Sequence, residues 1–216
     1  MNLSQLEFGA LLTYTPRGFT QKELHSKDVM IFLKRDQSVG NPPILMTEWI
    51  AKQVKQKLAD LPFSHFFQPN TILVPAPKSS LMQPDTLWVP ERIAKALVAE
   101  GMGCQVVPCL TRSKPVAKAA SCPSSERPTA EQHYDSLIVQ GALSKPEEIV
   151  IIDDVITRGA TLLGCANRLT DAFSECRIRA FSAMRTISNS EEFQSVYSPC
   201  IGTITLSMSG QTYRRP

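Results

Sequence analysis

The sequence predicts an α/β fold with a mainly parallel, twisted sheet that is flanked by helices. Short apolar runs typical of buried strands, such as 149–152, alternate with longer stretches in which apolar residues recur at helical spacing, such as 161–173. The run 149–152 is apolar on both faces, as expected for a strand covered by helices on both sides. Alternation of strand and helix is the pattern that builds parallel sheets.

Three elements are predicted in the first half of the chain. Apolar residues recur at helical spacing over 47–61, and Thr47 is the candidate N-cap. The run 71–74 indicates a buried strand that ends at Pro75, because proline lacks the amide hydrogen that a sheet ladder needs. A helix is expected over 90–101, since a proline suits the first helical turn and a glycine suits the end.

Further strands are predicted over 105–107, 149–152, 177–181 and 201–208, with a helix over 161–173. Alternation in the last strand predicts that Ile204, Leu206 and Met208 face the core. The segment 29–33 fits either a strand or the end of a helix.

The stretch 111–134 is rich in serine, proline, lysine and alanine and has no periodicity. Ordered domains seldom keep so long a loop without a use, so it is a candidate mobile active-site loop. At most one of its basic residues is expected to close over a leaving group, the candidates being Arg112, Lys114, Lys118 and Arg127. At its far edge, His133 and Tyr134 either stack on a substrate base or pack against the protein.

Composition limits the class of protein. Apolar residues make up 43% and charged residues 20% of 216 residues, which is the balance of a globular domain. The net charge of +3 is small and the basic residues of the chain are scattered along it, so direct nucleic-acid binding is not indicated. No apolar stretch is long enough to cross a bilayer, and we expect a cytoplasmic protein. The six cysteines include no CxxC pair, which favours reduced thiols over a zinc site.

The chemistry is expected where the strand 149–152 meets Asp153 and Asp154 and then the segment 157–161. Two carboxylates at the carboxyl end of a strand accept hydrogen bonds from vicinal hydroxyls and favour a nearby divalent cation. Gly159 allows close backbone approach, and the amides at a helix start suit a phosphate. The sequence therefore predicts a site for a ribose that carries a phosphate, outside the carboxyl ends of parallel strands.

This order of residues resembles the phosphoribosylpyrophosphate motif of the type I phosphoribosyltransferases: four apolar residues, two acidic residues, two apolar residues, then Thr-x-Gly-x-Thr. The resemblance implies the type I phosphoribosyltransferase fold, with one domain over 1–216 and with 1–45 and 187–216 as accessory or hood elements. It also implies that Asp153 and Asp154 hold the ribose hydroxyls. The 5-phosphate would be wrapped by Thr157, Arg158, Gly159, Ala160 and Thr161.

The family also places a pyrophosphate-binding loop after an early strand. The resemblance assigns this role to Ala76, Pro77, Lys78 and Ser79. The runs Val74-Pro75-Ala76-Pro77 and Gly141-Ala142-Leu143 look like the ComF group of the family, which is linked to DNA uptake. However, the cysteine-rich amino-terminal knuckle of that group is absent. Leu87-Trp88-Val89-Pro90 stands where its Arg-Gly-Phe-Asn run is usual, and Trp88 is expected in the core or at an interface.

The sequence leaves two points open. An acidic pair at a strand end also occurs in receiver domains and in magnesium-dependent phosphatases, but 157–161 favours the phosphoribosyl reading. Arg158 stands where a small or hydroxyl residue is commoner in the family. Its side chain either turns onto the phosphate or extends to solvent, and the outward pose is the expectation.

The resemblance implies a transferase that binds 5-phosphoribosyl-1-pyrophosphate (PRPP) with Mg²⁺ and passes the phosphoribosyl group to an unidentified nitrogen acceptor. Asp153, Asp154 and Lys78 are the expected catalytic residues. Mg²⁺ would be held mainly by PRPP and through water by the two aspartates. The alternatives are a sensor that binds PRPP without chemistry, or a ComF-like accessory protein in DNA uptake or processing. A homodimer is one possible assembly.

Overall fold

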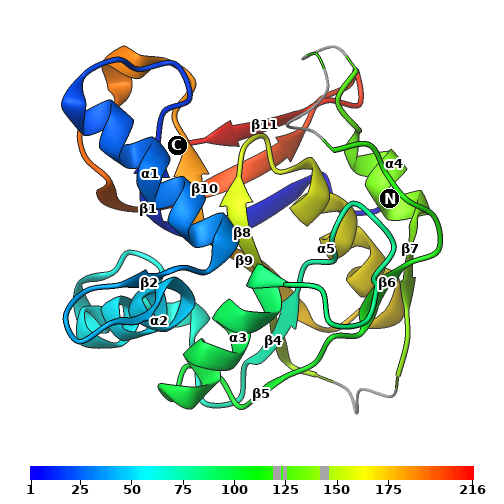
Figure 1. Cartoon of the computed structure of the whole chain (residues 1–216). Helices are drawn as coiled ribbons and strands as arrows, with labels where there is room; N and C mark the ends of the chain where they lie inside the picture. Colours follow the sequence, from blue (N-terminus) through cyan, green and yellow to red (C-terminus); the bar gives the residue numbers. More distant parts are fainter. Residues whose placement is uncertain (119–122, 124–125, 142–145) are drawn as a thin grey trace.

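The computed structural model describes residues 1–118, 123, 126–141 and 146–216. Part of the stretch 111–134 and the pair Ala142-Leu143 of the ComF-like run lie outside the described residues. The centre of the molecule is a seven-stranded sheet in the order β11-β10-β1-β9-β8-β4-β5, with helices packed on both faces (Figure 1).

The strands of this sheet are β1 (Gln5–Tyr14), β4 (Ile72–Pro75), β5 (Gln105–Val106), β8 (Glu148–Ile156), β9 (Arg177–Thr186), β10 (Tyr197–Leu206) and β11 (Thr212–Arg215). Neighbouring strands from β5 to β1 run parallel, and only β10 and β11 join antiparallel. The predicted α/β fold with a mainly parallel sheet is therefore confirmed. Two small hairpins pair β2 (Ser38–Val39) with β3 (Ile44–Leu45) and β6 (Leu110–Arg112) with β7 (Leu137–Val139).

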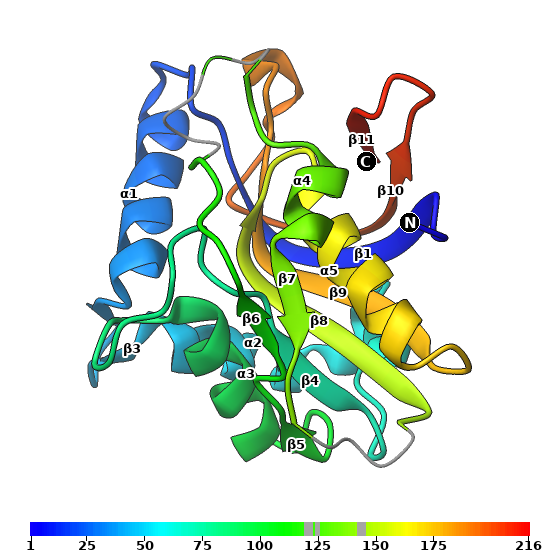
Figure 2. The same cartoon turned by 90° about the vertical axis from the view of Figure 1, so that its right-hand side faces the viewer.

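Helices cover both faces of the sheet (Figure 2). On one face lie α1 (Gln21–Arg35), α2 (Met46–Gln56) and α3 (Val89–Ala99), and on the other lie α4 (Ala130–Asp135) and α5 (Ala160–Ala172). Strand β8 contributes to both cores: Val150 and Ile152 pack with α2 and α3, while Ile149 and Ile151 pack with α5. The run 149–152 is therefore apolar on both faces because each face is covered.

Several element boundaries differ from the sequence-based expectation. Helix α2 ends at Gln56, before the expected position 61, and Leu45 rather than Thr47 is its N-cap residue. Strand β8 does not end before the acidic pair but continues to Ile156, because its pairing with β9 extends to the Ile156–Arg185 register. Helix α3 begins at Val89 with Pro90 in its first turn, as predicted.

The two ends of the chain can now be described. Residues 29–33 lie in the second half of α1, which is the helical one of the two alternatives, and β1 is an inner strand of the main sheet. Strand β10 ends at Leu206, so Met208 is fully exposed and the prediction that it faces the core is wrong. Ile204 is buried as predicted.

The stretch 111–134 is not a loop throughout. Its start belongs to β6, and its end forms α4, which opens with a reciprocal cap between Thr129 and Gln132. Trp88 is a core residue, and its indole Nε1 donates to the Ala76 carbonyl at 2.8 Å. No helix among the described residues is long and apolar enough to cross a bilayer. The described cysteines are free thiols, and Cys109 and Cys165 are buried.

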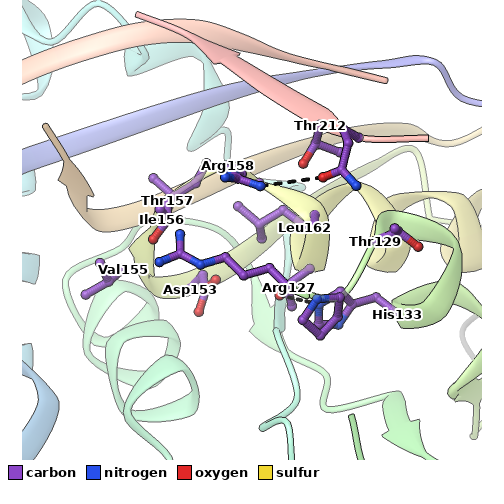
Figure 3. A pocket seen from close by; sticks show the side chains of 15 residues that line it. Arg127, Thr129, His133, Asp153, Val155, Ile156, Thr157, Arg158, Leu162 and Thr212 are labelled. Atoms are coloured by element: carbon purple, nitrogen blue, oxygen red, sulfur yellow. Dashed lines mark hydrogen bonds between the residues drawn. The ribbon is translucent and has the colours of Figure 1, made fainter. Parts of the chain in front are cut away.

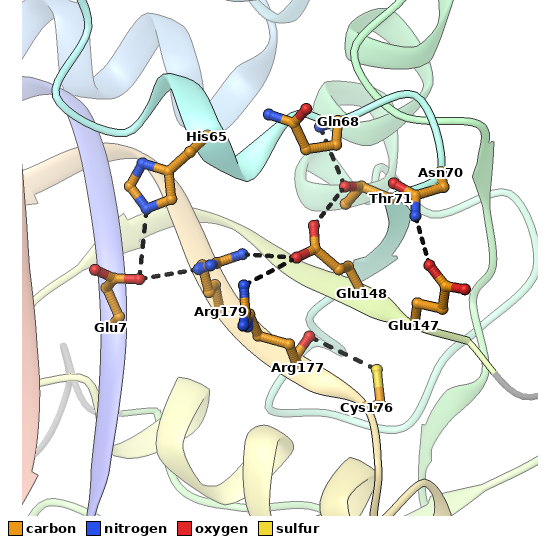
Figure 4. A network of polar contacts seen from close by, with 10 residues as sticks. All are labelled: Glu7, His65, Gln68, Asn70, Thr71, Glu147, Glu148, Cys176, Arg177 and Arg179. Atoms are coloured by element: carbon orange, nitrogen blue, oxygen red, sulfur yellow. Dashed lines mark hydrogen bonds and ion pairs between the residues drawn. The ribbon is translucent and has the colours of Figure 1, made fainter.

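Ion pairs join strands β1, β8 and β9 near the amino ends of these strands (Figure 4). Arg179 on β9 is nearly buried, and its Nε lies 2.9 Å from Glu7 on β1. Its Nη1 lies 3.5 Å from Glu148 on β8. The amino ends of these strands thus carry structural ion pairs.

Asp36, at the end of α1, contacts both α2 and α3. Its buried carboxylate accepts from the Thr47 amide at 3.0 Å, at the start of α2, and from Arg92 Nη1 on α3 at 2.8 Å. Asp36→Ala is expected to lower the free energy of unfolding by about 2 kcal/mol, because it leaves a buried amide without an acceptor. Urea unfolding measures this. Asp36→Asn keeps an oxygen for Thr47 and tolerates the left-handed backbone of residue 36, so it should lose clearly less. Equal losses would contradict the capping role.

Candidate functional site

The acidic pair lies where β8 extends beyond the end of its neighbouring strand β4. The last β4 residue, Pro75, is in register with Ile152, so Asp153 and Asp154 follow beyond the end of β4. The Asp154 amide donates to Asp153 Oδ1 at 2.9 Å. Burial and the adjacent charge of Asp154 raise the pKa of the Asp153 carboxyl. The structure therefore places both predicted ribose-binding carboxylates at the carboxyl edge of the sheet, close to each other.

Lys34 at the end of α1 is a residue of this site that sequence reasoning missed. Its Nζ lies 2.8 Å from both carboxylate oxygens of Asp154. Burial disfavours the charged lysine, but the charge of Asp154, the hydrogen bond to it and the charge of Asp153 together outweigh burial, and the pKa of Lys34 is raised. Lys34 thus offsets the repulsion between the two aspartates. Nothing in the sequence links these residues, which are 120 positions apart.

The segment 157–161 forms the floor of a small pocket of about 100 Å³ (Figure 3). Gly159 adopts a left-handed backbone with φ 86° and is the N-cap of α5, so the chain turns sharply from strand to helix there. The amides of the first helical turn have no partners within the helix and suit an anion. Asp153, Thr157 and Thr161 line the same pocket. The five residues predicted to wrap a phosphate are therefore gathered around one cavity.

Two arginines approach this pocket from different directions. Arg127, from the segment before α4, reaches across it, and its buried Nε has no hydrogen-bond partner among the described residues (Figure 3). Arg158 extends toward Thr212, and its Nη1 lies 3.5 Å from Gln211 Oε1.

The four basic residues expected in the stretch 111–134 have separate places. Arg127 lines the pocket, Arg112 is buried, and Lys114 and Lys118 are not among the lining residues.

The predicted pyrophosphate loop follows β4 directly and lies beside the acidic pair. The Ala76 amide donates to the Ile152 carbonyl at 2.8 Å, which fixes the loop against β8. The Lys78 carbonyl accepts from Arg112 Nε at 2.5 Å, and the Ser79 carbonyl accepts from the Val116 amide at 2.8 Å. Because the Ala76 amide is used internally and Pro77 has none, an anion here would meet the amides of Lys78 and Ser79.

The residues present fit a metal that is held mainly by its substrate. Among the described residues no group of three histidine, cysteine or acidic side chains could hold a metal ion. Two neighbouring carboxylates, Asp153 and Asp154, do face the same edge. Mg²⁺ keeps several waters and commonly uses one or two carboxylates together with substrate phosphates, which this donor set can provide.

His133 and Tyr134 both engage α5. His133 is buried, and its Nε2 lies 3.3 Å from Thr161 Oγ1. The Tyr134 hydroxyl donates to Asp171 at 2.5 Å, and its ring lies 3.9 Å from the Arg168 guanidinium carbon. Of the two open alternatives, packing against the protein is what the structure has.

The last strand, β11, holds the backbone beside the pocket in place. Arg214 on β11 donates from Nε to the Thr157 carbonyl at 2.9 Å and from Nη2 to the Thr186 carbonyl at 2.6 Å. Burial and nearby Arg185 lower the pKa of Arg214 to about 10. Gln211 and Thr212, just before and at the start of β11, line the pocket. Sequence reasoning did not assign Arg214 this role.

Comparison with known proteins gives little beyond this geometry. No model of a protein family matches the chain, and no curated protein sequence matches it. Among solved structures, the chain is similar to a hypoxanthine phosphoribosyltransferase from Staphylococcus aureus in a tetragonal crystal form, at 10% identity and a TM-score of 0.36, over 66% of this chain and 73% of that one. The orthorhombic form gives 11% identity and a TM-score of 0.32, over 70% of each chain. A likeness at this level does not extend to substrate or activity.

Proposed function

We propose that this protein is a phosphoribosyltransferase that binds PRPP with Mg²⁺ and transfers the phosphoribosyl group to a nitrogen acceptor with release of pyrophosphate. The observation that carries the proposal is one continuous arrangement at the carboxyl end of β8. There, two carboxylates, a left-handed glycine and the start of α5 surround a pocket that two arginines approach. This arrangement suits a phosphorylated ribose, and it agrees with the motif that resembles the type I phosphoribosyltransferases.

The 5-phosphate takes the pocket above 157–161. The pocket of about 100 Å³ is lined by all five residues of 157–161. The first-turn amides of α5 and the helix dipole favour an anion there. Arg127 adds a positive charge from the opposite wall. Each of these groups has the sign and the direction that a phosphate requires.

The ribose hydroxyls bind the acidic pair and take the place of Lys34 on Asp154. Ionised carboxylates only accept hydrogen bonds, so they suit the two hydroxyls at C2 and C3 of the sugar. Lys34 forms an ion pair with Asp154 before the ligand binds. Its side chain is 47% exposed, so it can swing away at little cost when the sugar arrives.

Pyrophosphate leaves beside the loop of Ala76, Pro77, Lys78 and Ser79, which is held next to the acidic pair. Breaking the bond at C1 places positive charge on the sugar ring and negative charge on the leaving group. Asp153 and Asp154 stabilise the ring, and Lys78 offers a positive charge to the pyrophosphate. When bound, Mg²⁺ would neutralise part of the charge that develops on the leaving group.

Arg158 is expected to contribute little to this binding. Its side chain extends toward Thr212 on the side of β11, while the phosphate has backbone amides and Arg127. Arg158→Thr should therefore change the Kd for PRPP by less than about threefold, measured by calorimetry at fixed Mg²⁺ and ionic strength. A loss of tenfold or more would show that Arg158 is a phosphate ligand.

Release of pyrophosphate tests the proposed reaction. The protein is incubated with PRPP, Mg²⁺ and pooled purines, pyrimidines and related amides, and mass spectrometry detects any phosphoribosylated product. A product with stoichiometric pyrophosphate supports the proposal. PRPP binding without pyrophosphate release for any acceptor would instead favour a sensor. Absence of PRPP binding would refute both.

A further inference from the structure

A buried chain of polar side chains joins the pyrophosphate loop to the phosphate pocket. It begins at Arg112 on β6, whose Nε donates to the Lys78 carbonyl at 2.5 Å and whose Nη1 donates to the Ser136 hydroxyl. The Arg112 Nη2 lies 3.0 Å from His133 Nδ1. On the other side of the ring, His133 Nε2 lies 3.3 Å from Thr161 Oγ1, at the wall of the pocket. Both Arg112 and His133 are buried.

The arginine fixes which nitrogen of His133 carries the proton. A guanidinium stays protonated and has donors only, so His133 Nδ1 must accept. A neutral imidazole has one acceptor and one donor, so Nε2 carries the hydrogen. Burial and the Arg112 charge lower the pKa of His133 to about 3, which agrees with a neutral ring. His133 Nε2 therefore donates to the Thr161 hydroxyl.

This donation in turn fixes the direction of the threonine hydroxyl. The Thr161 oxygen accepts from His133, so its own proton is free to be given elsewhere. No further hydrogen bond of this hydroxyl is found among the described residues, and Thr161 lines the pocket together with Arg127. A hydroxyl that accepts from a buried ring also becomes a better donor, because hydrogen bonds in a chain polarise one another.

We propose that Arg112 and His133 are positioning residues that hold the Thr161 hydroxyl as a donor aimed at the phosphate of the ligand. The identity of that phosphate, the 5-phosphate of a ribose, rests on the proposed function. His133 touches no substrate in this arrangement and takes part in no proton transfer. Arg112 cannot rotate away, because the Lys78 carbonyl and the Ser136 hydroxyl hold its other nitrogens.

The tautomer of His133 is tested in the unmodified protein. ¹⁵N NMR of histidine-labelled protein distinguishes a protonated Nε2 from a protonated Nδ1 and from a charged ring. The chain has three histidines, and His133→Gln identifies the signals of residue 133. We expect a neutral ring with the proton on Nε2 that does not titrate between pH 5 and 8. A proton on Nδ1, or a charged ring, would overturn this inference but would leave the proposed function unaffected.

Ligand binding tests the role of the hydroxyl, with ribose 5-phosphate as the probe in calorimetry. Thr161→Val and His133→Phe should each weaken binding by roughly tenfold or more, since the first removes the charge-assisted hydrogen bond to the phosphate and the second removes the ring that orients its donor. If His133 acts through Thr161, the double variant should bind no more weakly than Thr161→Val alone. His133→Gln should restore most of the affinity, because its amide can accept from Arg112 and donate to Thr161. Thr170→Val, whose hydroxyl bonds to the Ala166 carbonyl on the same helix, is the matched control and should bind normally.

The outcomes separate the two proposals. Parent-like binding by Thr161→Val, or fully additive losses in the double variant, would overturn the positioning role. The proposed function would still stand if the parent protein binds PRPP. A parent that binds neither ribose 5-phosphate nor PRPP would overturn the proposed function and the phosphate-directed role together. Nε2 protonation with coupled losses at His133 and Thr161 supports the inference.

Discussion

PRPP with Mg²⁺, at a hundredfold excess over the dissociation constant, is expected to stabilise the folded protein by about 2.7 kcal/mol. For a chain of 216 residues this corresponds to a rise in melting temperature of roughly 5 to 11 °C. The reason is that β8, the loop and α5 form the pocket only when they are assembled. Asp153→Asn combined with Asp154→Asn should remove this rise, because amides cannot replace both carboxylates as acceptors for the ribose hydroxyls.

The unliganded double variant should stay folded. The two carboxylates repel each other in the absence of ligand, and Lys34, which loses its partner, is half exposed and can return to solvent. Asp28→Asn combined with Asp60→Asn is a control with the same change in charge at exposed positions, and it should keep the full thermal shift. Thermal unfolding with and without ligand measures both. A double variant at the site that is stabilised as much as the parent would refute the ribose assignment.

Gly159→Ala is expected to lower the free energy of unfolding by roughly 2 to 4 kcal/mol, as the sum of a left-handed alanine and an overpacked contact. A Cβ on residue 159 would lie 2.6 Å from Cγ1 of Ile204, whose side chain is fully buried on β10. The clash cannot be relieved without moving either the sheet or the loop. Ligand binding should therefore fall together with stability, which urea unfolding and calorimetry report separately.

Gly210 offers a matched control for this substitution. It has φ 78°, close to the value at Gly159, but a Cβ there would meet nothing within 4 Å. Gly210→Ala should pay only the backbone cost of about 1 kcal/mol. The difference between the two variants then measures the contact with Ile204. Equal losses at both glycines would show that the loop can move away from β10.

The sequence predicted the centre of the fold better than its borders. Strand β8 and helix α5 were found because their apolar residues are frequent and periodic, and the acidic pair between them has a recognisable spacing. The continuation of β8 through Asp153 and Asp154 was not predicted, because the apolar pattern that indicates a strand stops before these two acidic residues. Their strand conformation depends on pairing with β9, which a linear pattern does not contain.

Missed elements have specific physical causes. Helix α4 has only six residues, which is too short for a periodicity to be visible, although its cap at Thr129 and Gln132 is a signal that could have located it. The residue type of Thr47 predicts a cap. Its helix instead uses the carboxylate of Asp36, eleven positions earlier in the chain.

The parts of the site that come from distant elements were the least predictable. The ion pair between Lys34 and Asp154 depends on where α1 packs, and the position of Arg127 depends on how the chain enters α4. Neither has a local signature. The segment 157–161, by contrast, is contiguous, so its spacing alone located the pocket floor.

The place of β1 in the sheet has a consequence for how the chain is made. This first strand lies between β9 and β10, and Phe8 is in register with Ala180 and Gly202. At a synthesis rate of about 5 to 20 residues per second, β1 is made roughly 8 to 40 s before its partner strands are complete. During that interval its apolar side chains have no sheet to join, and such long-range pairing is slow in any case. The central sheet can therefore close around β1 only after β9 and β10 have been synthesised.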